Sequence, residues 1–240
     1  QVQRICGSRR VPPAALLLLA ATGGWALVEY LGGRTRGVTG SDPYCYAQMA
    51  VDFARRGDPR HLFTLFPLVR GLGIPWYPVV HVGYRLPTNA AGLAPTVWPA
   101  GWPVLLSIAY RLLGEPGLYV AAPVAGLLAL MAVAALAAEV WPSDRAADRW
   151  LGVALAVAIL ATSREQVLQL LVPMADVPAQ LFSVVAVWLA LRAASGRSWA
   201  LAALAGGDST IPSIRMVGLR GEPSAASISL PPVQLPVAGS

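Results

Sequence analysis

The sequence contains no lysine, and only 12% of its 240 residues are charged. Soluble domains carry about 25% charged residues, whereas 56% of this chain is hydrophobic. Composition therefore predicts an integral membrane protein. The net charge of +6 comes from arginine alone. Many of the arginines stand at the ends of apolar runs, as in membrane proteins, and none of them form a nucleic-acid-binding face.

Cysteine and histidine are scarce as well. Cys6 and Cys45 flank the first apolar run, so they predict no disulfide framework. His61 and His81 stand far apart with no cysteine nearby, which is not a recognisable pattern of metal ligands. The sequence also lacks a glycine-rich phosphate loop and a nucleophile elbow.

Apolar runs are the main feature that the chain does have. We expect membrane spans at 11–31, 117–141, 151–162 and 177–191, the third of them short. The first run could instead belong to a cleaved signal peptide, although Pro12-Pro13 follow the arginines where such signals carry apolar residues.

The C-terminal part of the chain has a different character. A fifth run, 199–205, stops after about seven residues, too short to cross a membrane. Residues 206–240 are rich in Ser, Pro and Gly and show no helical period. We expect a disordered tail or a truncation artefact there, with residues 1–205 forming the N-terminal part of an all-α polytopic bundle.

The distribution of arginine predicts the topology of this bundle. The segment 101–114 is short for a span and suits a helix lying in the membrane interface. On that interpretation the N-terminus and the arginine-bearing loops 142–149 and 192–198 are all cytoplasmic. The long first loop, 32–116, and the connector 163–176 are then extracytoplasmic. If 101–114 spans the membrane instead, the positive-inside rule fails for both arginine-bearing loops.

Two acids in the predicted extracytoplasmic loops, Asp42 and Asp176, share one arrangement. Each is followed within two residues by a proline and then by an expected helix. Helix capping is the simple structural explanation, and proton transfer from an acceptor hydroxyl is the functional one. After Asp42, an amphipathic helix is expected with Tyr44, Ala47 and Val51 near one face and Asp52 elsewhere.

Three motifs together resemble the GT-C superfamily of membrane glycosyltransferases. They are "GSDPYCYAQMAVDFARRG", "VWPAGWPVLLSIAYRLLG" and "VPMADVPAQLFSVVAVWLALR", in this order over residues 40–192. The resemblance is to the branch with the dolichyl-phosphate-mannose–protein mannosyltransferases and the lipid A aminoarabinose transferase, similar to glycosyltransferase family 39. In that family a first-loop acid precedes a tyrosine-bearing amphipathic helix, an apolar helix lies along the membrane, and a second-loop acid precedes a span.

The resemblance implies transfer of a sugar from a polyprenyl-phosphate donor to a hydroxyl of a protein, lipid or glycan acceptor, with inversion at the anomeric carbon. Asp42 would be the general base or would orient the acceptor, and Asp176 would hold a partner arginine or a divalent cation. The motifs assign no set of metal ligands and require no other cofactor. Pro43 stands where the family often has a second acid, so a paired carboxylate is absent at that position.

The remaining candidates are residues for substrate contacts. Tyr44 and Tyr46 lie in the first motif and Trp102 in the second, where an interfacial aromatic belt is the alternative to stacking on a sugar. Arg70 and Arg85 could bind a donor phosphate, or face water and lipid headgroups. A non-enzymatic membrane protein, such as a transporter component, remains the alternative class, as does an inactive fragment. Transporters usually place polar residues within their spans, and these spans are nearly free of them.

Overall fold

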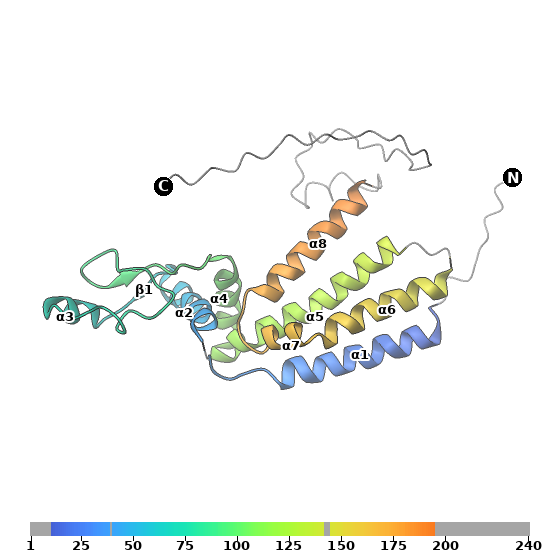
Figure 1. Ribbon diagram of the computed structural model, residues 1–240, viewed down its shortest axis with the longest axis horizontal. Helices are drawn as coiled ribbons and strands as arrows, with labels where there is room; N and C mark the ends of the chain where they lie inside the picture. Colours follow the sequence, from blue (N-terminus) through green and yellow to red (C-terminus); the bar gives the residue numbers. More distant parts are fainter. Residues whose placement is uncertain (1–10, 39, 142–144, 195–240) are drawn as a thin grey trace, which may run out of the picture. The chain divides into compact units, whose positions relative to one another are not determined.

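A computed structural model describes residues 11–38, 40–141 and 145–194 of the chain, and this part is mostly helical (Figure 1). The elements are α1 (Pro13–Gly32), α2 (Ser41–Arg56), β1 (His61–Leu62), α3 (Phe66–Gly71), β2 (Leu93–Ala94), α4 (Gly101–Leu113), α5 (Glu115–Val140), α6 (Ala146–Thr162), α7 (Arg164–Leu170) and α8 (Asp176–Ala194). The expected fifth span, the tail 206–240 and Cys6 lie outside the described residues.

Three helices in the described part, α1, α5 and α8, are long and apolar enough to cross a membrane. They lie within a few residues of the spans expected at 11–31, 117–141 and 177–191. Helix α6 packs against both α1 and α5, and α8 packs against α5. The arrangement indicates an all-α membrane protein.

A small apolar core joins these helices. It consists of Ala26, Tyr30, Leu130, Val157, Ala161, Leu170 and Val177, which come from α1, α5, α6, α7 and α8. The Tyr30 hydroxyl, fully buried, donates a hydrogen bond of 2.8 Å to the carbonyl oxygen of Ala161. This bond ties α1 to the end of α6. It also gives the buried hydroxyl the hydrogen-bond partner that a polar group inside a helix bundle needs.

The expected third span at 151–162 has different bounds. Helix α6 begins earlier, at Ala146, and it is followed after Ser163 by α7 at a bend of 57°. The pair could form one broken span or a re-entrant segment. The mixed connector expected at 163–176 therefore contains a helix, because Arg164–Leu170 places apolar Val167 and Leu170 against the bundle.

Residues 33–38 and 40–114 lie at one end of the helix bundle (Figure 1), and we call this part the first-loop module. Strands β1 and β2 pair antiparallel, His61 with Ala94 and Leu62 with Leu93. A second apolar cluster, Cys45, Phe63, Phe66, Val80, Tyr84 and Ala94, fills the space between these strands, α2 and α3. Gly92 permits this packing, because it has φ of 95° and a Cβ there would lie 2.3 Å from the Phe63 carbonyl oxygen.

Helices α2 and α4 connect this module to the bundle. Tyr46, Ala47 and Ala50 of α2 pack with Leu106 of α4 and with Leu118 of α5. Helices α4 and α5 approach closely at Gly117, where a Cβ would lie 2.2 Å from the backbone oxygen of Ala109. The short helix expected at 101–114 is thus a packed element between α2 and α5.

The buried residues of α2 extend beyond the expected face. They are Pro43, Cys45, Tyr46, Ala47, Met49, Ala50 and Asp52. Tyr44, Ala47 and Val51 do share one face, because all three line the same hollow. Burial extends further because α2 packs on two sides, with Cys45 in the cluster near β2 and α3 and with Tyr46 and Ala50 against α4 and α5. A single apolar stripe describes only one such contact.

Candidate functional site

The two loops with the sequence-predicted acids meet at the same end of the helix bundle. Thr35, just after α1, donates from its backbone N–H to the carbonyl oxygen of Leu171 at 2.9 Å, and its hydroxyl donates to the same oxygen at 2.7 Å. The indole N–H of Trp102 donates to the carbonyl oxygen of Pro173 at 3.1 Å. These bonds hold segment 171–176 against both the end of α1 and the start of α4.

Asp42 and Asp176 both lie within electrostatic reach of the Tyr46 hydroxyl. Burial raises the pKa of Tyr46, and the negative charges of Asp176 and Asp42 raise it further. Met174 and Ala175, directly before Asp176, pack against the apolar cluster that contains Tyr46. The structure therefore brings α2, which carries Asp42 and Tyr46, close to the start of α8, which carries Asp176.

Asp42 does not cap α2 with its side chain. Gly40 occupies the N-cap position with φ of 94° and no side-chain bond caps the helix. Asp42 stands in the first turn, half-buried, and its carboxylate accepts a hydrogen bond from the Ser41 hydroxyl at 2.8 Å. The structural explanation for Asp42 is therefore not a capping hydrogen bond. It is the favourable interaction of a negative charge with the N-terminal end of the helix dipole.

Tyr44 and Trp102, two of the expected substrate contacts, line hollows beside this region. Tyr44 lines a hollow of about 230 Å³ along α2 together with Gln48 and Arg55. Trp102 lines an apolar groove of about 410 Å³ between α4, α5 and α8. The α8 wall of this groove begins at Pro178, two residues after Asp176.

The two arginines expected to bind phosphate lie elsewhere. Arg70, on α3, is exposed and lines a hollow with Val69 and Trp76. Arg85 is also exposed, and its backbone N–H bonds to the Pro95 carbonyl oxygen at 2.8 Å. Neither arginine shares one of the hollows described here with Tyr44, Trp102 or Asp176.

Arg34 and Arg36, which the sequence did not single out, lie beside the hollow that contains Tyr44. They line a hollow of about 370 Å³ with Thr35, Glu115 and Tyr119. Glu115 and Tyr119 also line the hollow that contains Tyr44. Their position could have indicated them, because two arginines that directly follow a span must lie at the end of the bundle.

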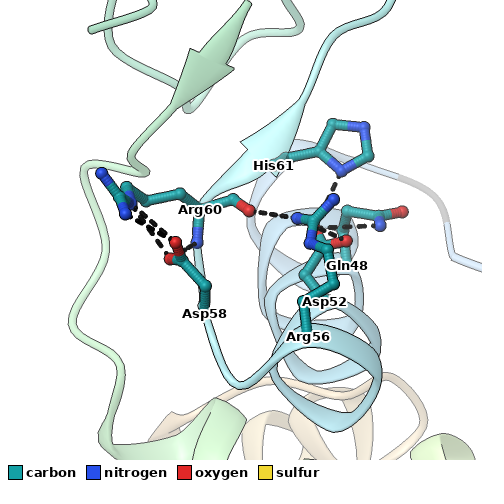
Figure 2. A network of polar contacts seen from close by, with 6 residues as sticks. All are labelled: Gln48, Asp52, Arg56, Asp58, Arg60 and His61. Carbon is teal, nitrogen blue, oxygen red and sulfur yellow. Dashed lines mark hydrogen bonds and ion pairs between the residues drawn. The ribbon is translucent and has the colours of Figure 1, made fainter.

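Asp52, predicted on the polar side of α2, is buried and stands at the centre of a polar network (Figure 2). Its carboxylate lies 2.8 Å from His61 Nδ1 and 3.0 Å from Arg56 Nη2, and it accepts a bond of 3.2 Å from Gln48 Nε2. Arg56 also donates to the carbonyl oxygen of Arg60. The network ties α2 to β1, which explains why an acid occupies a buried position.

The described residues contain no group of three or more His, Cys, Asp or Glu side chains that could hold a metal ion. His61 is paired with Asp52, and the ring of His81 lies 4.4 Å from that of Tyr44. Each histidine thus has a local packing role in the first-loop module.

The three apolar helices define the class of the chain as a helical membrane protein, with a loop module and two acids at one end of the bundle. Comparison with protein-family models, with curated proteins and with solved structures found no match.

Proposed function

We propose that this protein is a membrane glycosyltransferase that moves a sugar from a polyprenyl-phosphate-linked donor to an acceptor hydroxyl at the extracytoplasmic face. One observation carries the proposal: the segment before Asp176 is held at the α2 helix that carries Asp42, by the bonds of Thr35 and Trp102 to Leu171 and Pro173 and by the packing of Met174 and Ala175 in the cluster of Tyr46. Loops 32–116 and 163–176 would both be extracytoplasmic and the N-terminus cytoplasmic. The resemblance of the three sequence motifs to the GT-C superfamily supports this assignment.

Asp42 is the general base in the proposed reaction. Its carboxylate takes the proton of the acceptor hydroxyl while the acceptor oxygen forms a bond to the anomeric carbon of the sugar. The bond from that carbon to the phosphate oxygen breaks, and polyprenyl phosphate leaves with the electron pair, so the anomeric configuration inverts.

The donor phosphate is best accommodated by Arg34 and Arg36. Guanidinium groups match phosphate oxygens in geometry and charge. Both arginines line a hollow of about 370 Å³ that shares Glu115 and Tyr119 with the hollow beside Tyr44. Arg70 and Arg85, the arginines first expected in this role, lack such a connection.

The apolar groove between α4, α5 and α8 suits the polyprenyl chain of the donor. Its lining runs from Trp102 and Pro178 to Leu128 and Phe182, on helices that include two candidate membrane spans. Trp102 donates to Pro173, so the groove begins at the segment that carries Asp176. A chain in the groove would hold its phosphate near the end of the bundle.

The proposal is tested by transfer assays on the full chain in lipid nanodiscs, with a panel of labelled polyprenyl-phosphate sugars and membrane extract as acceptor. Asp42→Asn keeps the size of the side chain and removes the base, so we expect transfer to fall by about 10²–10⁴-fold. Asp58→Asn is the matched control, because Asp58 is paired with Arg60 in the same module and should leave transfer unchanged.

Retention of transfer by the Asp42→Asn variant would contradict the assignment of the base. Absence of transfer by the parent chain with every donor would contradict the enzymatic function and favour the transporter-like alternative.

A further inference from the structure

A polar hollow of about 330 Å³ lies between α7 and the start of α8. It is lined by Glu165, Gln166, Gln169, Asp176, Val177 and Gln180. Each helix contributes an acid and, four residues later, a glutamine: Glu165 and Gln169 on α7, Asp176 and Gln180 on α8. Residues four apart lie on one face of a helix, so both helices turn a similar polar face to the hollow.

Two of these glutamines have unused hydrogen-bonding groups. Gln166 is only 6% exposed, yet its Nε2 has no hydrogen-bond partner within the part of the chain that the structure describes. The buried Oε1 of Gln180 likewise lacks a partner among the described residues. Buried polar groups are nearly always paired, and one that is not calls for an explanation. A leucine of similar size would fill either place without this cost.

The lining residues restrict the chemistry of a ligand. The hollow has two carboxylates, three carboxamides and no cationic residue, which disfavours phosphate and other anions. Carboxylates accept hydrogen bonds, whereas carboxamides both donate and accept them. Neighbouring hydroxyl groups, each able to donate and to accept, match this set. The volume lies at the lower end of the range for small-molecule sites.

The hollow is also connected to the proposed reaction centre. Asp176, one of its lining residues, is within electrostatic reach of Tyr46, as is Asp42. Consecutive residues of α8 line different spaces: Val177 faces the polar hollow, and Pro178 lines the apolar groove. A sugar in the hollow and a lipid chain in the groove would thus lie on either side of the first turn of α8.

We propose that the hollow between α7 and α8 binds the hydroxyl groups of the transferred sugar, with Gln166, Gln180 and Asp176 as its main contacts. The claim that this sugar is the transferred one rests on the proposed function. The claim that the hollow binds a sugar does not. Gln166 donates from Nε2, Gln180 accepts at Oε1, and Asp176 accepts from a hydroxyl that is directed toward the acids.

Saturation-transfer NMR on the full chain in lipid nanodiscs tests the site without any need for turnover. The probes are methyl α-D-mannopyranoside, methyl β-D-glucopyranoside and methyl β-L-arabinopyranoside, with ethanolamine as a cationic comparison. We expect at least one glycoside to bind and ethanolamine not to bind. Gln166→Leu should weaken glycoside binding roughly tenfold, the equivalent of about 1.4 kcal/mol, while its melting temperature stays equal to or above that of the parent.

Gln169→Leu is a second variant in the same hollow and should also weaken binding. Arg164→Gln is the matched control, because Arg164 is exposed on the same helix and does not line the hollow. Its binding should equal that of the parent. Asp42→Asn should bind the glycoside normally, since Asp42 is outside the hollow.

The outcomes separate this site from the proposed function. Glycoside binding that depends on Gln166, in a chain that transfers no sugar, supports the site and contradicts the glycosyltransferase. Sugar transfer with an unchanged KM for the donor in both Gln166→Leu and Gln169→Leu overturns the site alone. The site is also overturned if no glycoside binds, if binding is unaffected by both variants, or if ethanolamine binds in a Gln166-dependent manner instead.

Discussion

The helix bundle and the first-loop module differ in whether they bury a charge. Both expose large apolar side chains: Leu17, Val28, Met131 and Ile159 of the bundle are each about 70% exposed, and Leu72 and Leu112 of the module are 64% and 76% exposed. Among the described residues, Asp52 of the module is the one buried charged side chain, 6% exposed among three partners. The buried polar side chains of the bundle, Thr22 and Gln166, are uncharged.

This difference predicts where single substitutions act most strongly. In the bundle an outward-facing position tolerates any apolar side chain but no charge. In the module an outward-facing position tolerates charge, and the sensitive positions are the buried polar ones. Four experiments test the contrast, from the largest expected effect to the smallest.

Asp52→Ala should have the largest effect on the module. Removal of this carboxylate leaves His61 and Arg56 without their shared partner, and we expect a loss of about 3 kcal/mol, the low end for a broken buried ion pair. The partners are partly exposed, which limits the cost. Hydrogen exchange of amides 44–62 in nanodiscs measures the effect.

The control for Asp52→Ala is Asp58→Ala, which breaks the more exposed pair with Arg60 and should cost less than about 1 kcal/mol. Equal losses of protection in the two variants would mean that burial of Asp52 has no special role.

Met131→Arg and Leu112→Arg compare two exposed positions directly. Met131 is 68% exposed near the middle of α5, and Leu112 is 76% exposed at the end of α4. Arginine in the middle of a span costs about 2.5 kcal/mol or more, whereas an interfacial helix accepts it. A glycosylation-reporter insertion assay should show reduced insertion for Met131→Arg alone. Equal insertion would show that α5 does not cross the lipid.

Alkaline pH should weaken the module through Cys45. Burial, together with the smaller effect of the charge of Asp42, raises the pKa of this thiol from 9.0 to about 11. The folded state therefore holds the proton more tightly than the unfolded state. This contribution to stability is complete below about pH 9 and is lost as the pH rises through about 11. In Cys45→Ala the decline in the melting temperature over this range should be shallower than in the parent, and an identical decline would refute the assignment.

Tyr30→Phe should have the smallest effect. It removes the 2.8 Å bond to the Ala161 carbonyl oxygen and leaves the ring in place. Hydrogen bonds between membrane helices contribute about 0.6 kcal/mol on average, so the unfolding free energy in a detergent titration should fall by about that amount. A loss several times larger would show that the bundle depends on specific contacts as much as the module does.

The sequence predicted the three long spans well, because hydropathy is a local property of the chain. The observed helices Pro13–Gly32, Glu115–Val140 and Asp176–Ala194 match the expected runs closely. The short run at 151–162 was harder, since its continuation as α7 depends on the packing of Val167 and Leu170 against the bundle. Local hydropathy does not indicate a 57° bend followed by a further helix.

The roles of the site residues stay predictions, and the structure shows only where these residues lie. Asp42, Asp176, Tyr44, Tyr46 and Trp102 lie at the same end of the bundle or in hollows beside it. Gln166, Gln180, Arg34 and Arg36 were missed, because glutamines and loop arginines are ordinary residues until a fold places them around a common space.

The sequence by itself determined that this chain builds apolar helices, since each span is encoded by a continuous run whose transfer into lipid is favourable residue by residue. Only the tertiary structure decided which polar groups come together: Asp52 pairs with His61, and Gln166 and Gln180 line one hollow with Asp176. The reason is physical. These meetings arise from the packing of helices and loops against one another, and the free energy of such contacts depends on the positions of both partners.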